Sequence, residues 1–467
     1  MAEGLVMAAR QSSRDSQLRQ LAFDGFGEPA QQAEKNGSSF SDPAFAVNKQ
    51  APIHRWVPWI AGFSMEFVRD AIGRYIPAKQ GTVLDPFSGV GTTLIESVLA
   101  GHNAIGFEIN PYAAFACRVK LNAYRTDLRL LNEEIGRLSL FHRYTLSNHY
   151  VVRSSPPKRF NTRSPFYSPS VLQKVLLVQD FIDTLQDDSI KDLFRLAFAS
   201  TMVRYSNYSY EPSLGRRVSA GKEEILDFPV VETVEAKLRE MADDIGWMRS
   251  KMPSYAVSSQ VINASFFDCR PHVHSEVADL IVTSPPYLNN YHYNRNTRPQ
   301  LYWLGFVNTP EDMRPLEEMN FGKFWQTVRE RERIDLAFSL TDSDIADKLE
   351  RLRQLHPEKG VYGGNGWANY AASYFNDCLR FAEGIKYVLK SGGAALVVIG
   401  NSILQGVMIP TDRYFGEIAE SVGLTLVDIH IPRETRVGNS IIQSEVRVSK
   451  AEDTHQLYEA VVEVRKG

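Results

Sequence analysis

Five residues in the middle of the chain have the types and order needed to hold a planar amine. Thr283-Ser284-Pro285-Pro286-Tyr287 follow Leu280-Ile281-Val282, an apolar run typical of a buried strand. Proline fixes φ and lacks an N–H, and the first proline favours an extended Ser284. The turn therefore offers carbonyl acceptors, a hydroxyl and a flat ring together. Such a turn suits a nucleobase that carries an exocyclic amine, although an ordinary packed loop would explain the same residues.

A glycine-rich turn lies upstream, in residues 81–93, between a short apolar strand and the start of a helix. Gly89 and Gly91 let the backbone approach a ligand closely, because glycine has no Cβ and tolerates positive φ. The next strand ends in Glu108, and a carboxylate there can accept hydrogen bonds from both hydroxyls of a ribose. This order predicts a nucleoside-cofactor site. The turn lacks the third glycine of the dinucleotide fingerprint, which argues against NAD.

Strands and helices alternate around these motifs. The pattern predicts an α/β fold with a doubly wound, mostly parallel sheet and a C-terminal antiparallel hairpin. Strands are expected at 81–85, 104–108, 260–264, 278–282, 394–399, 425–431 and 441–448, and helices at 64–75, 92–100, 374–389 and 414–422, with Ser64 as an N-cap. Ligands of such sheets bind at the carboxyl ends of the strands, so both motifs are expected to face one cleft.

The chain divides into a core, two insertions and an arm. Residues 1–50 are polar and weakly patterned, and we expect a mobile N-terminal arm there. The α/β core is expected in 51–125, 256–290 and 371–467. Residues 126–255 form a helical insertion whose basic composition makes it a candidate region for DNA binding and target recognition, and 291–370 form a second insertion, a candidate for contact with DNA or a partner. Its part from Arg329 to Glu358 is expected to be an exposed helix pair.

Composition excludes several classes of protein. A chain of 467 residues with 43% hydrophobic and 23% charged residues is ordinary for a soluble protein, and no apolar run approaches the ~20 residues that span a bilayer. The three scattered cysteines and the unclustered histidines predict a reducing cytosol and no metal site. The formal net charge of −3 means that any DNA-binding surface must be a local patch.

The two motifs together resemble a known family. The segment DPFSGVGTT followed by GFEINP resembles the S-adenosylmethionine (SAM) site of amino-methyltransferases that act on DNA, and TSPPY resembles their catalytic motif. IAGFS at 60–64 resembles the segment that closes over the methionine end of the cofactor, and VLKSGGAALVVIG a later helix–strand pair. The resemblance implies a Rossmann-like SAM methyltransferase fold with helical insertions. The serine form of the catalytic motif is typical of cytosine-N4 enzymes.

The resemblance also implies roles for individual residues. The residues implied to bind the cofactor are Phe63, Ser64, Asp85, Phe87, Gly89, Gly91, Thr92, Thr93, Glu108, Asp268 and Thr283. Ser265 is the alternative to Asp268, because the Gly-Asp-Ala common in the family is absent here. The implied catalytic residues are Ser284, Pro285, Pro286 and Tyr287: the Ser284 side chain and the Pro285 carbonyl accept the two amine hydrogens, and Tyr287 stacks on the extruded base. The chain lacks the Pro-Cys nucleophile of carbon-5 enzymes, so no covalent intermediate is expected.

Basic residues gather where the chain has no acidic ones. Between Glu134 and Asp180 there is no acidic residue, and aromatic side chains alternate with cations. The residues expected to contact DNA phosphates are Arg153, Lys158, Arg159 and Arg163 here, with Arg295 and Arg298 in the polar–aromatic run after the catalytic motif. Residues 204–217 and the pair Arg433 and Arg436 are further candidates. A solvated basic face would explain the same composition.

These observations predict a SAM-dependent methyltransferase that flips a base out of double-stranded DNA and modifies the N4 amine of cytosine. The family implies a restriction-modification or related defence setting, with a cognate restriction or defence component as a partner. A cytoplasmic protein associated with the nucleoid through DNA is expected, with no membrane contact. Three alternatives remain open: modification of adenine N6, modification of an amine in structured RNA, and a non-catalytic SAM-fold subunit that only binds DNA.

Overall fold

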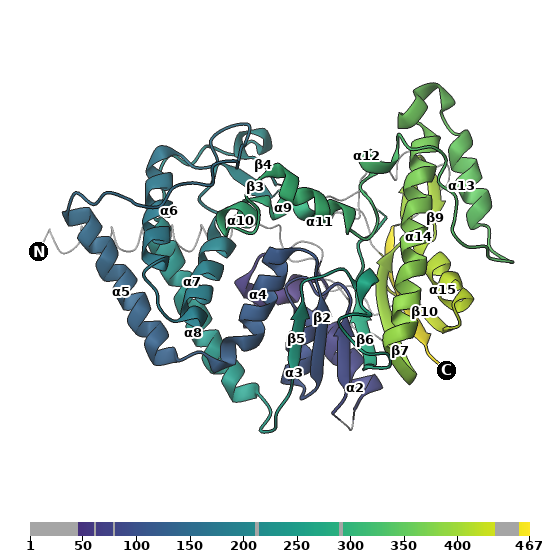
Figure 1. Ribbon diagram of the computed structural model, residues 1–467, viewed down its shortest axis with the longest axis horizontal. Helices are drawn as coiled ribbons and strands as arrows, with labels where there is room; N and C mark the ends of the chain where they lie inside the picture. Colours follow the sequence, from purple (N-terminus) through teal and green to yellow (C-terminus); the bar gives the residue numbers. More distant parts are fainter. Residues whose placement is uncertain (1–44, 60–61, 78–79, 211–213, 289–292, 435–456) are drawn as a thin grey trace, which may run out of the picture. The chain divides into compact units, whose positions relative to one another are not determined.

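Seven strands form the central sheet, in the order β10-β11-β7-β6-β1-β2-β5 (Figure 1). The strands are β1 (Thr82–Asp85), β2 (Asn103–Phe107), β5 (Ser259–Ile262), β6 (Ala278–Thr283), β7 (Leu389–Gly400), β10 (Thr425–Glu434) and β11 (Tyr458–Arg465). Every neighbouring pair from β7 to β5 is parallel, whereas β11 runs antiparallel to both β7 and β10. The predicted mostly parallel sheet with an antiparallel C-terminal pair is confirmed.

The computed structural model describes residues 45–59, 62–77, 80–210, 214–288, 293–434 and 457–467. All of these residues belong to one unit, Gly37–Gly467. The α-helices of this part are α2 (Met65–Tyr75), α3 (Thr92–Leu99), α4 (Pro111–Asn122), α5 (Leu128–Ser147), α6 (Pro169–Ile182), α7 (Asp188–Thr201), α8 (Val230–Lys251), α9 (Tyr293–Asn296), α10 (Arg298–Trp303), α11 (Arg314–Glu318), α12 (Trp325–Val328), α13 (Ile345–Gln354), α14 (Gly364–Val388) and α15 (Thr411–Ser421). None of them is long and apolar enough to cross a membrane.

Short elements complete the described part. The 3₁₀ helices are η1 (Phe45–Lys49), η2 (His54–Trp56), η3 (Ala123–Arg125), η4 (Arg217–Ala220), η5 (Phe266–Asp268), η6 (Pro310–Met313) and η7 (Pro357–Tyr362). Two small hairpins are formed by β3 (Tyr208–Tyr210) with β4 (Leu214–Arg216), and by β8 (Ser402–Leu404) with β9 (Val407–Ile409).

Successive strand residues point to opposite sides of the sheet, so both faces carry apolar side chains. Helices cover both faces. On one face, Val83 and Leu280 pack with Phe67 of α2. On the other face, Leu84 and Ile281 join a cluster that includes α14 and α15. Ser64 caps α2 as predicted, since its side chain accepts a hydrogen bond from the Glu66 N–H at 3.1 Å.

The first insertion is helical and shares a core with the part of the chain that carries the sheet. Buried side chains of α5, α6, α7 and α8 pack in one cluster with those of α3, α4 and α10. Asp244 of α8 ties the segment before the sheet to this core. Its carboxylate accepts hydrogen bonds from the Ile53 backbone at 2.8 Å, the Trp56 indole at 2.9 Å and the Arg55 guanidinium at 2.6 Å. This network holds Ile53 at a φ of 66°, which a β-branched residue rarely adopts.

Three expectations need correction or restriction. The strand paired with β10 is β11, and residues 441–448 lie outside the described residues. The expected helix pair over 329–358 is wrong. The described residues 329–358 contain one α-helix, α13, because residues 329–344 form loops. The Asn369 side chain holds these loops by hydrogen bonds to their backbone. Residues 1–44 of the expected arm lie outside the described part, and Phe45–Lys49 forms η1.

Candidate functional site

The two motifs meet at one edge of the sheet. Asp85 ends β1, Thr283 ends β6, and Glu108 follows the last residue of β2. These strands are parallel neighbours, so their carboxyl ends lie side by side. The Thr283 hydroxyl donates a hydrogen bond to the Asp85 carboxylate at 2.6 Å. The cofactor motif and the catalytic motif are therefore joined directly, although they are far apart in the sequence.

Asp85 organises the turn that follows it. Its Oδ1 atom also accepts a hydrogen bond from the backbone N–H of Phe87 at 3.0 Å. Burial raises the pKa of Asp85 to about 6, and the hydrogen bond from Thr283 opposes this rise by favouring the ionised form. At neutral pH, a buried carboxylate thus fixes both the start of the glycine turn and the end of β6.

The backbone of the glycine turn favours glycine at two positions, Gly89 and Gly91. Gly89 and Gly91 have φ values of 50° and 91°, in the left-handed region that disfavours other residues. A Cβ on Gly91 would lie 2.5 Å from the sulfur of Cys117, so a side chain there would collide. The indole of Trp59 lies over Gly89, with Nε1 3.2 Å from where a Cβ would stand. The turn is consequently tight and bordered by an aromatic ring.

Glu108 faces this turn and is half-buried. Its Oε2 atom accepts a hydrogen bond from the Gly89 N–H at 2.9 Å, and Oε1 accepts one from the Asn110 N–H at 2.7 Å. Burial raises the pKa of Glu108 to about 7, and these two backbone donors partly oppose the rise. The backbone N–H of Ile109 is a third donor, and a carboxylate has about four lone-pair sites, so Glu108 keeps acceptor capacity for a ligand's hydroxyl group.

The other cofactor candidates lie around this edge in supporting positions. Thr93 is fully buried and donates to the Val282 carbonyl at 3.2 Å, which ties α3 to β6. Phe63 is buried against Phe67. The ring of Phe87 packs on Phe321 and Phe381.

The candidates for the adenine end follow β5. Ser265 is buried and caps η5, whereas Asp268 is exposed at the end of the same turn. Neither is hydrogen-bonded to Glu108 in the described part of the chain. Asn263 is the closer group: its side chain donates to the carbonyls of Glu108 at 2.8 Å and Ile109 at 3.1 Å. Asn263 directly follows the end of β5, and a polar side chain in that position is a signal that the sequence contains.

Two buried polar side chains behind the cofactor turn were also missed. Asn48 of η1 is 0% exposed, donates to the Phe63 carbonyl at 3.1 Å and to the Thr92 hydroxyl at 3.4 Å, and accepts from the Met65 N–H at 2.9 Å. Lys120 of α4 is 1% exposed and donates to the Val90 carbonyl at 3.3 Å. Burial lowers the pKa of Lys120 to about 7.

The catalytic loop is held from three elements. The Tyr374 hydroxyl of α14 donates to the Pro286 carbonyl at 3.0 Å, and the Ser402 hydroxyl of β8 donates to the Leu288 carbonyl at 2.6 Å. The Tyr287 hydroxyl donates to the Glu459 carboxylate of β11 at 3.3 Å. Ser284, Pro286 and Tyr287 remain partly exposed, whereas Pro285 is buried.

The expected DNA-contacting segments come together on the first insertion. Arg298 of α10 donates to the Asn161 carbonyl at 3.1 Å, and its guanidinium lies over the rings of Phe160 and Tyr302. Asn296 accepts from the Tyr210 hydroxyl at 3.0 Å through its carbonyl. The segment around Phe160, the β3–β4 hairpin and α9–α10 therefore form one surface, which we call the basic surface. Its exposed cations are Lys158, Arg159, Arg163 and Arg295; Arg153 is also exposed, and its backbone N–H donates to Asp180 of α6.

The basic surface is joined to the cofactor edge by Asn110. The Asn110 side chain caps α4 through its oxygen and donates through its nitrogen to the Thr297 hydroxyl at 2.7 Å. Its backbone N–H is the one that donates to Glu108. Part of the polar run after the catalytic motif, 289–292, lies outside the described residues, as does Arg436; Arg433 lies on β10.

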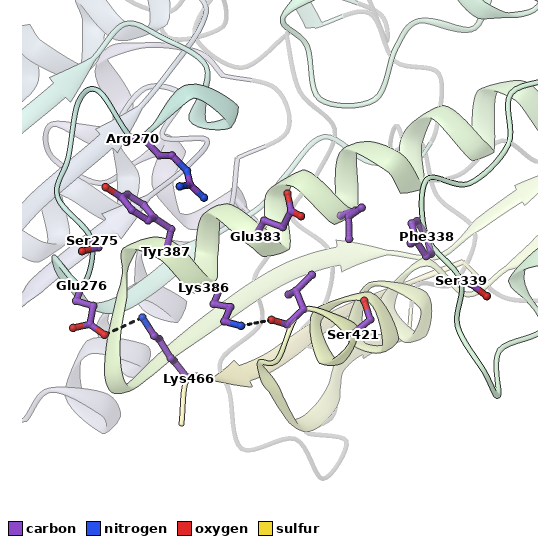
Figure 2. A pocket seen from close by; sticks show the side chains of 12 residues that line it. Arg270, Ser275, Glu276, Phe338, Ser339, Glu383, Lys386, Tyr387, Ser421 and Lys466 are labelled. Atoms are coloured by element: carbon purple, nitrogen blue, oxygen red, sulfur yellow. Dashed lines mark hydrogen bonds and ion pairs between the residues drawn. The ribbon is translucent and has the colours of Figure 1, made fainter.

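A separate pocket lies at the opposite edge of the sheet, where β7 begins (Figure 2). Lys466 donates there to the Leu389 carbonyl at 2.9 Å and pairs with Glu276 at 3.0 Å. None of the predicted site residues lines this pocket. In the described ranges, no group of three His, Cys, Asp or Glu side chains could hold a metal ion.

Comparisons with known proteins agree with this arrangement. Residues 30–116 match the model of the N6/N4 DNA methylase family, a stretch that contains the glycine turn and Glu108. The chain is 25% identical to the type II methyltransferase M.BsoBI of Geobacillus stearothermophilus over 85% of this chain and 83% of that protein. It is 26% identical to the type II methyltransferase M.AvaI of a Nostoc species, over 85% of this chain and 84% of that protein.

Among solved structures, an rRNA methyltransferase from Streptomyces viridochromogenes aligns over 90% of this chain and 92% of its own, with 9% identity and a TM-score of 0.29, a likeness too low to bear on function. Methyltransferases of the matched family use SAM as their cofactor. The chain thus matches the N6/N4 DNA methylase family over residues 30–116 and is a distant homologue of type II methyltransferases.

Proposed function

We propose that this protein is a DNA methyltransferase of the restriction-modification type that transfers the methyl group of SAM to the exocyclic N4 amine of cytosine. One observation carries the proposal: the Thr283 hydroxyl, one residue before the catalytic loop, is hydrogen-bonded to Asp85 of the cofactor motif at 2.6 Å. Methyl transfer needs the donor and the amine in contact, and this bond fixes the two motifs side by side.

The residues at the sheet edge fit SAM. Glu108 would accept hydrogen bonds from the ribose hydroxyls with the acceptor positions that Gly89 and Asn110 leave. The turn from Phe87 to Gly91, ordered by Asp85, would lie against the cofactor, with Phe63 and Ser64 near its methionine end. When bound, SAM supplies a sulfonium methyl group that is electrophilic without any help from an acid.

The catalytic loop would prepare the target base. An exocyclic amine conjugated to its ring is a weak nucleophile. Hydrogen bonds from its two N–H groups to the Ser284 hydroxyl and the Pro285 carbonyl would draw the nitrogen toward tetrahedral geometry, and Tyr287 would stack on the flipped base. The Pro286 and Leu288 carbonyls are already occupied by Tyr374 and Ser402, so the loop is held in place by other bonds.

The basic surface would hold the duplex while the base is flipped. Its cations are exposed on a segment without acidic residues, where phosphate groups can reach them. The rings of Phe160 and Tyr302 under Arg298 stiffen this side of the surface. The substrate would place the protein at the nucleoid, beside a cognate restriction or defence component.

A product assay tests the proposal and separates the two amines. Purified protein is incubated with tritiated SAM and plasmid DNA, and the DNA is digested to nucleosides. We expect label in N4-methylcytosine, and no label with Ser284→Ala, which keeps SAM binding but removes an acceptor for the amine. Label in N6-methyladenine would move the assignment to adenine. SAM and DNA binding without any labelled base would instead indicate a non-catalytic subunit.

Glu108 predicts a pH dependence of cofactor binding. Its raised pKa of about 7 means that the carboxylate gains a proton as the pH falls through neutrality, and a protonated group is a poorer acceptor for two hydroxyls. SAM affinity should fall about fourfold from pH 8 to pH 6.5 through Glu108, while Asp85 stays mostly ionised. Titration calorimetry measures this. Lys120, whose pKa is also about 7, titrates in the same window, so the Glu108→Gln variant is needed to isolate the contribution of Glu108. Glu108→Gln should bind more weakly at pH 8 but with a flatter profile, and equal profiles would contradict the role.

The basic surface predicts a salt-dependent loss of DNA affinity. Replacing Lys158, Arg159 and Arg163 together by glutamine should lower the affinity for duplex DNA and reduce the slope of log K against log salt by about 3 if each contacts a phosphate. Fluorescence anisotropy measures the slope. The matched control replaces Lys348, Arg351 and Lys359 of the second insertion by glutamine. A larger loss of DNA affinity in that control would indicate that the duplex binds to the second insertion.

A further inference from the structure

Tyr287 lies on a platform made by two paired strands. Its ring lies against Gly400 at the end of β7: a Cβ on Gly400 would stand 3.2 Å from both Cδ2 and Cε2 of Tyr287. A side chain at this position would press on the ring, which would have to shift by a few tenths of an ångström. Glu459 of β11 is the antiparallel register partner of Gly400. Directly opposed residues of such a pair lie close together, so the platform and the acceptor for the Tyr287 hydroxyl come from one rung of the sheet.

The acceptor is a buried carboxylate. Glu459 is 9% exposed, and its Oε1 atom lies 3.3 Å from the Tyr287 hydroxyl. This distance is longer than the usual separation for a hydroxyl and a carboxylate, so the bond sets the direction of the ring and can still shorten. A hydrogen bond to a buried charge is stronger than one between neutral groups.

The backbone on both sides of Tyr287 is fixed independently. The Tyr374 hydroxyl holds the preceding carbonyl at 3.0 Å, and the Ser402 hydroxyl holds the following one at 2.6 Å. With its backbone held, the ring keeps one freedom, rotation about its side-chain bonds. The contacts with Gly400 along one side of the ring and with Glu459 at the hydroxyl restrict that rotation.

We propose that Glu459 is a positioning residue for methyl transfer: by binding the Tyr287 hydroxyl, it sets the plane on which the flipped base stacks. This inference rests on the proposed function, in which Tyr287 stacks on the base. Glu459 acts through the tyrosine and touches neither base nor cofactor. Its effect therefore falls on the turnover of bound DNA and leaves cofactor affinity unchanged.

A double-mutant cycle tests the inference. Tyr287→Phe removes the hydroxyl and keeps the ring, and Glu459→Ala removes the acceptor. Each should lower kcat for plasmid methylation about fivefold while the Kd of SAM changes less than twofold. The double variant should be no worse than the single variants, because both remove the same bond. Glu459→Gln, which keeps a neutral acceptor, should lie between Glu459→Ala and the wild type.

One control variant separates this role from a merely structural one. Glu463→Ala removes another buried carboxylate of β11, which pairs with Arg465 at 3.0 Å, so it should lower Tm while leaving kcat near the wild-type value. If Glu459→Ala does not fold, the cycle is run with Glu459→Gln. Additive losses in the double variant, or wild-type kcat in Tyr287→Phe, would overturn the inference.

The failure of the inference can be told apart from the failure of the proposed function. If Tyr287→Ala abolishes methylation while Tyr287→Phe does not affect it, the ring stacks on the base without help from Glu459, and only the inference fails. If Tyr287→Ala methylates DNA like the wild type, the stacking role itself is wrong, and the inference falls with it.

Discussion

The hydrogen bond from Thr283 to the buried Asp85 carboxylate is the interaction on which the rest of the site depends. It joins the ends of β6 and β1, and its acceptor also holds the start of the glycine turn through the Phe87 N–H. Without it, a carboxylate whose pKa is already raised to about 6 would lose a donor in a buried position. The glycine turn and the catalytic loop would then no longer be held side by side at the carboxyl ends of β1 and β6.

Much of this edge could be predicted from the sequence, because parallel strands put their carboxyl ends together. The order strand, glycine turn, helix, strand and Glu108 predicted where one half of the candidate site lies, and the strand before Ser284 predicted where the other half lies. Asn48 could not be predicted, since it lies in a polar segment whose burial depends on contacts with Phe63 and Thr92. The pattern of apolar and polar residues along a segment indicates a strand or a helix. It does not indicate which distant segment packs against that element.

Glu459 illustrates the same limit at the other end of the chain. The sequence favoured residues 441–448 as the partner of β10, whereas the structure places β11 between β10 and β7. Only that strand order puts a carboxylate opposite Gly400 and beneath Tyr287. The basic surface was predicted as separate segments, and its assembly through Asn296 and Arg298 required tertiary hydrogen bonds that no single segment encodes.

A structure of the protein with S-adenosylhomocysteine tests the central claim most directly, because it locates the cofactor without relying on turnover. The account predicts both ribose hydroxyls on the Glu108 carboxylate, the backbone of Gly89 and Gly91 against the ligand, and the sulfur facing the loop that begins at Ser284. A ligand bound elsewhere, for example in the pocket lined by Glu276 and Lys466 at the opposite edge of the sheet, would contradict it.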